Sequence, residues 1–292
     1  MAEVRGSTGS PTVRRRELGA TLRTLRLDRG FTVDQVAEHL ECSPSKVSRM
    51  ETGRRGATPR DIRDLCDLYD VSDAQERERL LTLARRGRQQ GWWQSLSLPY
   101  KTFVGLEQEA TSMTIYHSAV VPGLLQISDY TRGIQEKGVP QLSAEEVEER
   151  VEERATRQEL LTRENPPQVE VFLDQAVMHR PIGGPRVIRK QLDSLLAAAR
   201  LPNVKVQILP YEVGSHPALE SNFIILAFDG EAPTVVYVEG LVGRLYVERP
   251  PEIERYLQVS EVLRGLALSP KDSAVLLENV RDTYEVDEYG HE

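Results

Sequence analysis

Cysteine is nearly absent from the sequence. Only Cys42 and Cys66 occur among its 292 residues, and each falls in a segment with helical periodicity. Neither has a second cysteine at the short spacing of a zinc or redox motif. The sequence therefore argues against a disulfide framework and against a cysteine metal site. We expect a protein of the reducing cytoplasm.

Long hydrophobic runs are also lacking. No stretch approaches the roughly 18–20 apolar residues that cross a membrane, and no apolar segment of a secretory signal follows the basic N-terminal residues. HExxH, P-loop, GxSxG and GxGxxG motifs are missing, so no catalytic residue, cofactor or metal ion is predicted. With 39% hydrophobic and 28% charged residues, the chain is long enough for two globular domains.

Positive charge is scarce outside the N-terminal part. Residues 1–60 carry twelve Lys or Arg against seven Asp or Glu, a balance of +5. The remaining residues have a balance of −13, which gives the net charge of −8 for the whole chain. This asymmetry predicts that only the N-terminal part meets a polyanion such as a nucleic acid.

Five helices are predicted in the first 90 residues. The second begins with the capping box of Thr32 and Gln35, Ser43 caps the third, Thr58 caps the fourth, and Ser72 caps the fifth. We expect a disordered arm at 1–12 and a helical head of five helices. The first four helices of the head form the helix-turn-helix domain, 13–71. The fifth helix belongs to a connector, 72–100, which also contains the Gly-Trp-Trp linker.

The second and third of these helices are joined by a short turn, as in a helix-turn-helix. On a helical wheel, Val47 and Met50 share one side of the third helix, and Arg49 lies on the other. A hydrogen-bonding face opposite a packing face suits the major groove of DNA, and Arg bonds to the edge of guanine. The predicted DNA-binding residues are Thr32, Gln35, Ser43, Ser45, Lys46, Ser48, Arg49, Arg54 and Arg55.

The stretch FTVDQVAEHLECSPSKVSRMETGRRGATPRDIRDLCDLYDV resembles the XRE family of helix-turn-helix regulators, whose domain has the lambda-repressor-like fold. The resemblance places Ser45 and Arg49 at base-reading positions. Pro44 takes a third such position, where its side chain donates no hydrogen bond, and this shifts weight to Lys46. The resemblance also implies a partly buried structural ion pair between Arg26 and Glu51.

The rest of the chain changes pattern after Trp92 and Trp93, a pair that we expect to lock the junction between head and body. Runs with strand periodicity predict a mixed α/β domain around a sheet of about five strands, so the whole chain has the class α + α/β. The expected strands are 169–174, 204–210, 222–228, 234–240 and 244–248, and the expected helices are 104–118, 143–164, 185–200, 251–268 and 270–284.

Few side chains in the body suggest chemistry. Asp174 and His179 lie five residues apart at the end of a strand, which is a weak acid–base pattern, and an ordinary loop histidine is several times more common than a catalytic one. His216 and Glu220 lie in the loop GSHPALESNF, which is either a ligand-binding loop or a plain connection. The residues considered for a ligand or partner are Trp92, Trp93, Asp174, His179, His216 and Glu220.

The segment YHSAVVPGLLQISDYTRG (116–133) is similar to the signature of the DUF5753 family, which follows an XRE head in many actinobacterial regulators. Matching segments extend over most of 91–283, and we take 101–283 as this domain and 284–292 as a tail. Ile127 replaces a usual Thr, and Gln175 stands where an acid is common. The Val-Pro-Gly-Leu-Leu run reads mainly as a structural turn. The resemblance implies an antitoxin-like regulator with a small DUF397-type protein partner.

These observations predict a sequence-specific DNA-binding transcriptional regulator, cytoplasmic and nucleoid-associated. We expect a homodimer on an operator of double-stranded DNA, with a C-terminal domain that dimerises, binds a small protein partner or takes an unknown small-molecule effector. Two alternatives stay open. The protein could be an antitoxin whose DNA binding serves autoregulation, or its body could be an enzyme of unknown chemistry. A head that docks proteins without binding DNA is a further possibility.

Overall fold

The computed structural model describes residues 11–88, 92–94, 100–139, 141–230, 232–241 and 243–284. Most of the predicted arm and the tail beyond residue 284 lie outside the described residues, as does Gly91 of the linker. The chain divides into two compact units. One consists of Met1–Ala110 and Ala227–Thr234, and the other of Thr111–Leu226 and Val235–Glu292.

The first unit contains the predicted helical head. The predicted capping box of Thr32 and Gln35 is present, and Ser43 and Thr58 cap the next two helices. The prediction of Ser72 as the fifth cap is wrong, because Asp73 accepts the hydrogen bond from the backbone N–H of Gln75 instead. The helices are α1 (Pro11–Asp28), α2 (Val33–His39), α3 (Pro44–Glu51), α4 (Pro59–Leu68), α5 (Ala74–Arg86), η1 (Trp92–Gln94) and α6 (Lys101–Glu109).

Three helices of this unit end in the same way, with one residue in the left-handed conformation. Gly30, Glu41 and Asp70 have φ values of 72°, 48° and 51°. At each end the next backbone N–H reaches back five residues, as when Cys42 donates to the carbonyl of Ala37. These are Schellman motifs, which satisfy the last carbonyl groups of a helix. They turn the chain sharply and set the angles between α1, α2, α4 and the helices that follow.

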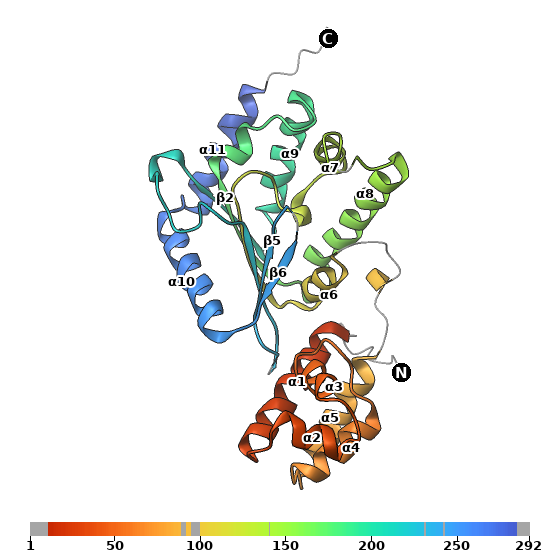
Figure 1. Ribbon diagram of the computed structural model, residues 1–292. Helices are drawn as coiled ribbons and strands as arrows, with labels where there is room; N and C mark the ends of the chain where they lie inside the picture. Colours follow the sequence, from red (N-terminus) through yellow and green to blue (C-terminus); the bar gives the residue numbers. More distant parts are fainter. Residues whose placement is uncertain are drawn as a thin grey trace, which may run out of the picture. The chain divides into compact units, whose positions relative to one another are not determined.

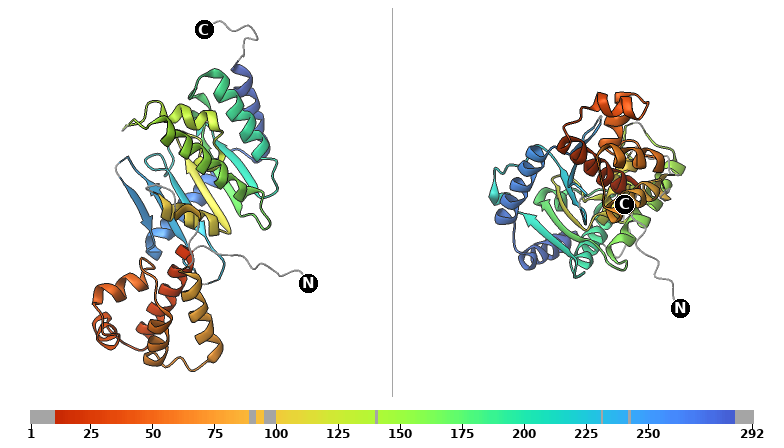
Figure 2. Two further views of the ribbon diagram at one scale, coloured as in Figure 1. Left: turned by 90° about the vertical axis from the view of Figure 1, so that its right-hand side faces the viewer. Right: turned by 90° about the horizontal axis from the view of Figure 1, so that it is seen from below.

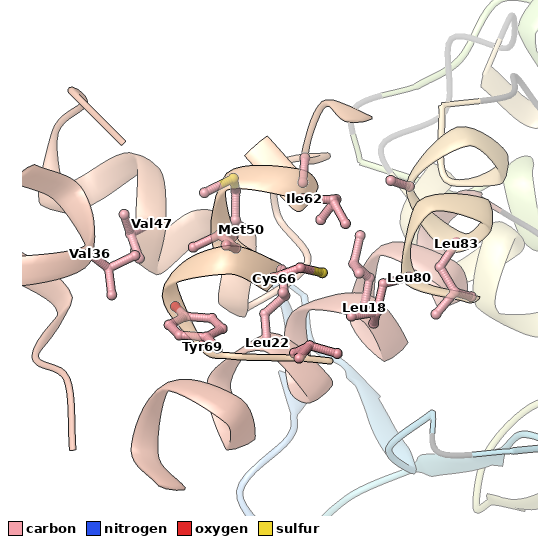
Figure 3. Packing of buried hydrophobic residues seen from close by; sticks show 14 of the residues in the cluster. Leu18, Leu22, Val36, Val47, Met50, Ile62, Cys66, Tyr69, Leu80 and Leu83 are labelled. Atoms are coloured by element: carbon pink, nitrogen blue, oxygen red, sulfur yellow. The ribbon is translucent and has the colours of Figure 1, made fainter. Parts of the chain in front are cut away.

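The core of the head is apolar and is built from all five helices (Figure 3). Leu22 of α1, Val36 of α2 and Ile62 of α4 are at most 2% exposed. Burial of such side chains is the main favourable contribution to folding, about 1.5–3 kcal/mol each. The core holds α2 and α3 in a fixed relation, which a helix-turn-helix needs.

The second unit is built around a six-stranded sheet, one strand more than predicted. Its order is β3-β2-β1-β4-β5-β6. β1, β2 and β3 pair in parallel, whereas β5 is antiparallel to both β4 and β6. The strands are β1 (Ser112–His117), β2 (Gln168–Asp174), β3 (Val204–Leu209), β4 (Phe223–Ala227), β5 (Val235–Glu239) and β6 (Arg244–Val247).

The extra strand corrects one prediction. A single helix was expected over 104–118, but α6 ends at Glu109 and β1 follows three residues later. Met113 and Ile115 are buried two positions apart on β1, the spacing of a strand, whereas Leu106, Ala110 and Met113 have the spacing of a helix. Parallel pairing with β2 decides between the two.

Helices cover both faces of the sheet, with α10 on one side and α7 and α8 on the other (Figures 1 and 2). Tyr116, Phe172 and Phe223 belong to one apolar cluster with Leu263 of α10. The remaining helices are η2 (Gly123–Leu125), α7 (Ser128–Gln135), α8 (Ala144–Gln158), η3 (Glu159–Leu161), η4 (Gln175–His179), α9 (Pro185–Ala198), η5 (Tyr211–Val213), α10 (Pro250–Leu266) and α11 (Pro270–Thr283). Within the described ranges, no helix is long and apolar enough to span a membrane.

Candidate functional sites

Hydrogen bonds fix the start of α2, the short turn between α2 and α3, and the start of α3. Thr32 and Gln35 bond each other's backbone N–H groups at the start of α2, at 2.8 and 3.2 Å. Glu41 takes the left-handed position of the turn, where glycine is usual. The Ser43 hydroxyl then accepts the backbone N–H of Lys46 at 3.2 Å. Both helix starts therefore have fixed, exposed N-termini, which favour nearby anions.

The two sides of α3 are as the wheel predicts. Val47 and Met50 are 2% and 3% exposed and pack in the core. Ser45, Ser48 and Arg49 are exposed on the other side. The Arg49 Nε–H donates to the carbonyl of Ser45 at 3.1 Å, which holds the guanidinium along the helix surface. This face presents hydroxyl and guanidinium donors to the solvent.

Lys46 differs from the other predicted DNA-binding residues. Its ammonium lies 2.8 Å from the carboxylate of Asp61 in α4, and both side chains are largely buried. Burial alone would raise the pKa of Asp61, but hydrogen bonds from Lys46 and from the backbone and hydroxyl of Thr58 hold that pKa below its usual value. The sequence predicts that Lys46 contacts DNA in place of Pro44, but in the structure its ammonium is held in this ion pair and is not exposed. Lys46 joins α3 to α4.

The predicted pair of Arg26 and Glu51 is confirmed. The two side chains form a bidentate ion pair with N···O distances of 2.6 and 3.0 Å, and they are 9% and 7% exposed. The third contact of Arg26 goes to the carbonyl of Phe31, at 2.8 Å. One guanidinium thus ties the end of α1 to the end of α3 and to the turn before α2.

Four further arginines of the head lie in two kinds of environment. Arg15 donates to the carbonyl of Gly87 at 2.5 Å, and Arg16 is 9% exposed. Arg54 and Arg55 are exposed in the loop after α3. Part of the head's positive charge is therefore used inside the fold, while the part next to α3 faces solvent.

Gly19 is a structural residue that the sequence reasoning missed. A Cβ atom at this position would lie 2.5 Å from the carbonyl oxygen of Met50 and 2.6 Å from that of Glu51. The backbones of α1 and α3 therefore cross at a distance that only glycine permits. The sequence gives a weak signal for this contact, because a glycine inside a strongly helical segment usually has a packing reason.

A second polar group of side chains gathers where β1, β2 and β3 end. Tyr116 is fully buried near the end of β1, and its hydroxyl lies 3.4 Å from Nε2 of His216. Burial raises the pKa of Tyr116 to about 12, and the charge of Asp174 adds to this. Burial also lowers the pKa of His216, against the opposite effect of Asp174. These three residues therefore lie close together, although 100 positions separate Tyr116 from His216.

The predicted acid–base pattern of Asp174 and His179 is not formed, since no hydrogen bond or ion pair joins them in the described structure. Asp174 Oδ1 accepts the backbone N–H of Ala176 at 2.8 Å and so begins η4. The ring of His179 stacks on the ring of Tyr211, with the two ring centroids 5.9 Å apart. Glu220 is exposed, and no hydrogen bond reaches it from the described residues.

Gln175, which stands where an acid is common, links these neighbours. Its Oε1 accepts the backbone N–H of Tyr211 at 2.9 Å, and its Nε2 lies 3.4 Å from Nε2 of His179. The amide therefore attaches η4 to the loop after β3. A carboxylate could accept the first hydrogen bond in the same way.

His117 ends β1 beside this group. Its Nδ1 is buried and has no hydrogen-bond partner among the described residues. Burial lowers the pKa of His117 to about 4, although a hydrogen bond with the backbone of Val120 opposes the shift. The side chain is therefore neutral at pH 7. Across the residues that the structure describes, no group of three His, Cys, Asp or Glu could hold a metal ion.

The predicted structural reading of the Pro-Gly-Leu-Leu segment fits its contacts. Gln126 donates to the carbonyl of Val121 at 2.6 Å and accepts from the hydroxyl of Thr131. Gln191 of α9 accepts the N–H of Ile127 at 2.8 Å and donates to the carbonyl of Leu125. These buried bonds attach η2 to α7 and α9.

Trp92 and Trp93 form a T-shaped pair with ring centroids 6.0 Å apart. Trp93 is 6% exposed, whereas Trp92 is 37% exposed. Their helix η1 contacts α6. Large buried indoles commonly anchor a connection in this way, and the junction role stays a prediction.

Two family models match the sequence. Residues 100–279 match the domain of unknown function DUF5753, and residues 17–80 match a helix-turn-helix domain. No curated protein and no solved structure matches the chain. The head thus carries the helix-turn-helix that its geometry indicates, and the sheet domain coincides with the larger match.

Proposed function

Since this chain belongs to the DUF5753 family and carries a helix-turn-helix domain ahead of it, we propose that it is a sequence-specific DNA-binding transcriptional regulator. In this proposal α3 enters the major groove of an operator. The proposal places the protein in the cytoplasm, on the nucleoid, and assigns no catalytic step to it.

One observation carries the proposal: α3 turns its apolar residues into the core and its donors outward. Val47 and Met50 anchor the helix, which leaves Ser45, Ser48 and Arg49 exposed. Serine hydroxyls permit close approach to base edges, and arginine recognises guanine through two hydrogen bonds. A face used only for solubility does not require short hydroxyl side chains beside an arginine.

Contacts to the DNA backbone would come from residues around α3. Arg54 and Arg55 are exposed beside it and would neutralise phosphates. Ser43 and the pair of Thr32 and Gln35 begin two helices whose N-termini attract phosphate groups. Such contacts position the protein, whereas contacts to bases give specificity.

A single head has a small interface, so we propose that the protein binds its operator as a homodimer. The sheet domain would supply the dimer contacts, and it would also accept a small protein partner of the DUF397 type or a small-molecule effector. The size of the full chain in solution, measured by light scattering, tests the dimer. A monomer at concentrations that saturate DNA would contradict it.

The groove assignment is tested by a gel shift with the DNA upstream of the protein's own reading frame. Arg49→Ala should weaken binding by about 1–3 kcal/mol and relax the preference at one base pair. Arg63→Ala is the control, because it removes an equal charge from an exposed position of α4, on the side of that helix opposite Asp61. An unchanged sequence preference in Arg49→Ala, with helicity intact, would refute the assignment.

A further inference from the structure

The carboxyl edge of the parallel strands has the features of a built site. β1, β2 and β3 end in register, since His117 is paired with Leu173 and Asp174 with Leu209. In open α/β sheets, ligands bind beyond this edge, at the point where the strand connections diverge. In this sheet the connections diverge at β1, because β2 and β3 lie on one side of it and β4 on the other.

The loop after β3 is fixed over this edge by polar contacts. The N–H of Tyr211 bonds to Gln175, and His216 is bonded to the buried hydroxyl of Tyr116. The backbone N–H of Ser118 donates to the side-chain oxygen of Asn222 at 2.9 Å. Three contacts along 210–222 hold the loop at its beginning, middle and end. The loop is therefore preorganised.

This loop presents an aromatic ring to the solvent. Tyr211 is 55% exposed and stacks on His179 with an interplanar angle of 26°. Tyr284, at the end of α11, lies near enough to Tyr211 to interact with it electrostatically, and its hydroxyl donates to the carbonyl of Met178 at 2.9 Å. The rings of His179 and Tyr211 are therefore in contact here, and the free face of an exposed aromatic ring can stack on a planar ligand.

Asp174 supplies a hydrogen-bond acceptor at the end of β2, directly before Gln175, whose side chain holds the backbone of Tyr211. Its Oδ1 is held by the N–H of Ala176, and no hydrogen bond within the described structure reaches Oδ2. An acidic residue at the end of the second strand is the group that binds the ribose hydroxyls in nucleotide-binding sheets. The oriented carboxylate can accept hydrogen bonds from two neighbouring hydroxyl groups in the same way.

The surroundings disfavour phosphate. The turn after β1 reads Ser-Ala-Val-Val-Pro and has no glycine-rich loop to hold a phosphate group. Glu212 and Glu220 are exposed on the same loop as Tyr211, and Arg180, which directly follows His179, is an exposed cation. Residues 61–292 have a balance of −13, and a net negative charge disfavours the approach of anionic ligands.

We propose that the carboxyl edge of β1–β3 binds an uncharged nucleoside, with its ring stacked on Tyr211 and its ribose hydroxyls bonded to Asp174. The nucleoside would be the small-molecule effector that the proposed function leaves open. Its binding does not depend on that function, but its effect on regulation rests on it. Tyr116, His216 and Gln175 position the loop and do not contact the ligand.

Isothermal titration of the full chain with adenosine, guanosine, cytidine and uridine tests the proposal. At least one should bind saturably below about 1 mM, and its 5′-monophosphate and 2′-deoxy forms should bind more weakly. Asp174→Asn keeps the Oδ1 acceptor and should weaken binding about ten- to a hundredfold. Tyr211→Ala should weaken it about tenfold. Glu220→Gln, an exposed acid on the same loop, is the matched control and should bind like the unaltered protein.

Three results would overturn the proposal. They are no saturable binding of any of the four nucleosides, tighter binding of the 5′-monophosphate, and wild-type affinity in both Asp174→Asn and Tyr211→Ala. Circular dichroism of each variant shows that it is folded. Because DNA binding is measured separately by gel shift, a failed titration leaves the regulator assignment intact, and a failed gel shift leaves the nucleoside site intact.

Discussion

The ion pair between Arg26 and Glu51 gives the sharpest test of how the head is held together. Glu51→Ala removes both carboxylate partners of a guanidinium that is 9% exposed. Arg26 then keeps only its bond to the carbonyl of Phe31. Breaking a buried pair by removing one partner costs about 3–5 kcal/mol, because the other charge stays buried.

The low end of this range is appropriate, since Leu27, next to Arg26 on α1, is 57% exposed and water can reach the emptied space from that side. A loss of about 3 kcal/mol should lower the melting temperature of the head by roughly 12–24 °C. Glu51→Gln keeps a carbonyl acceptor and should lose about half as much. Circular dichroism of the full chain at rising temperature measures both, with the exposed Asp28→Ala as control.

A double-mutant cycle separates pairing from the packing of each side chain. The double variant Arg26→Leu with Glu51→Leu leaves no buried charge, and we expect it to be more stable than either single variant. A coupling energy near zero would contradict the pairing argument. So would a Glu51→Ala variant that melts at the normal temperature and loses only DNA affinity.

Three further perturbations probe other features. Gly19→Ala should lower the free energy of unfolding by about 1–3 kcal/mol, because its Cβ would overlap the carbonyl oxygen of Met50. Glu41→Gly should raise that free energy by about 0.5–1 kcal/mol. This net gain is the relief of left-handed backbone strain minus the larger entropy that a glycine loses on folding. The folded-state pKa of His117 lies below its unfolded value, so stability should fall by up to about 3 kcal/mol as the pH drops from about 6.5 to 4. His117→Asn should flatten this dependence in urea titrations, whereas the exposed His179→Asn should not.

The head could be predicted from the sequence because its determinants are local. Caps such as Thr32 and Ser43 act on N–H groups three residues away, and the wheel assigns Val47 to the core without any knowledge of distant contacts. The fifth cap failed because Ser72 and Asp73 are adjacent and both suit the position. The choice there depends on backbone angles that composition does not fix.

The features that the sequence did not predict depend on contacts between residues far apart in the chain. Lys46 was assigned to the DNA-binding face, and its partner Asp61 belongs to another helix. Tyr116 and His216 meet only because the sheet brings β1 and the loop after β3 to the same edge. Helical spacing from Leu106 through Ala110 to Met113 masked the strand, whose identity depends on pairing with residues 168–174.

The close crossing of α1 and α3 has an evolutionary consequence. The crossing is set by the absent side chain of Gly19 and by two carbonyl oxygens of α3, which every residue type possesses. Ser45 and Ser48 take no part in it and point away from the core. Their identities can therefore change without altering how α3 is seated. If α3 reads DNA as we propose, relatives with the same frame can acquire new operators one surface substitution at a time.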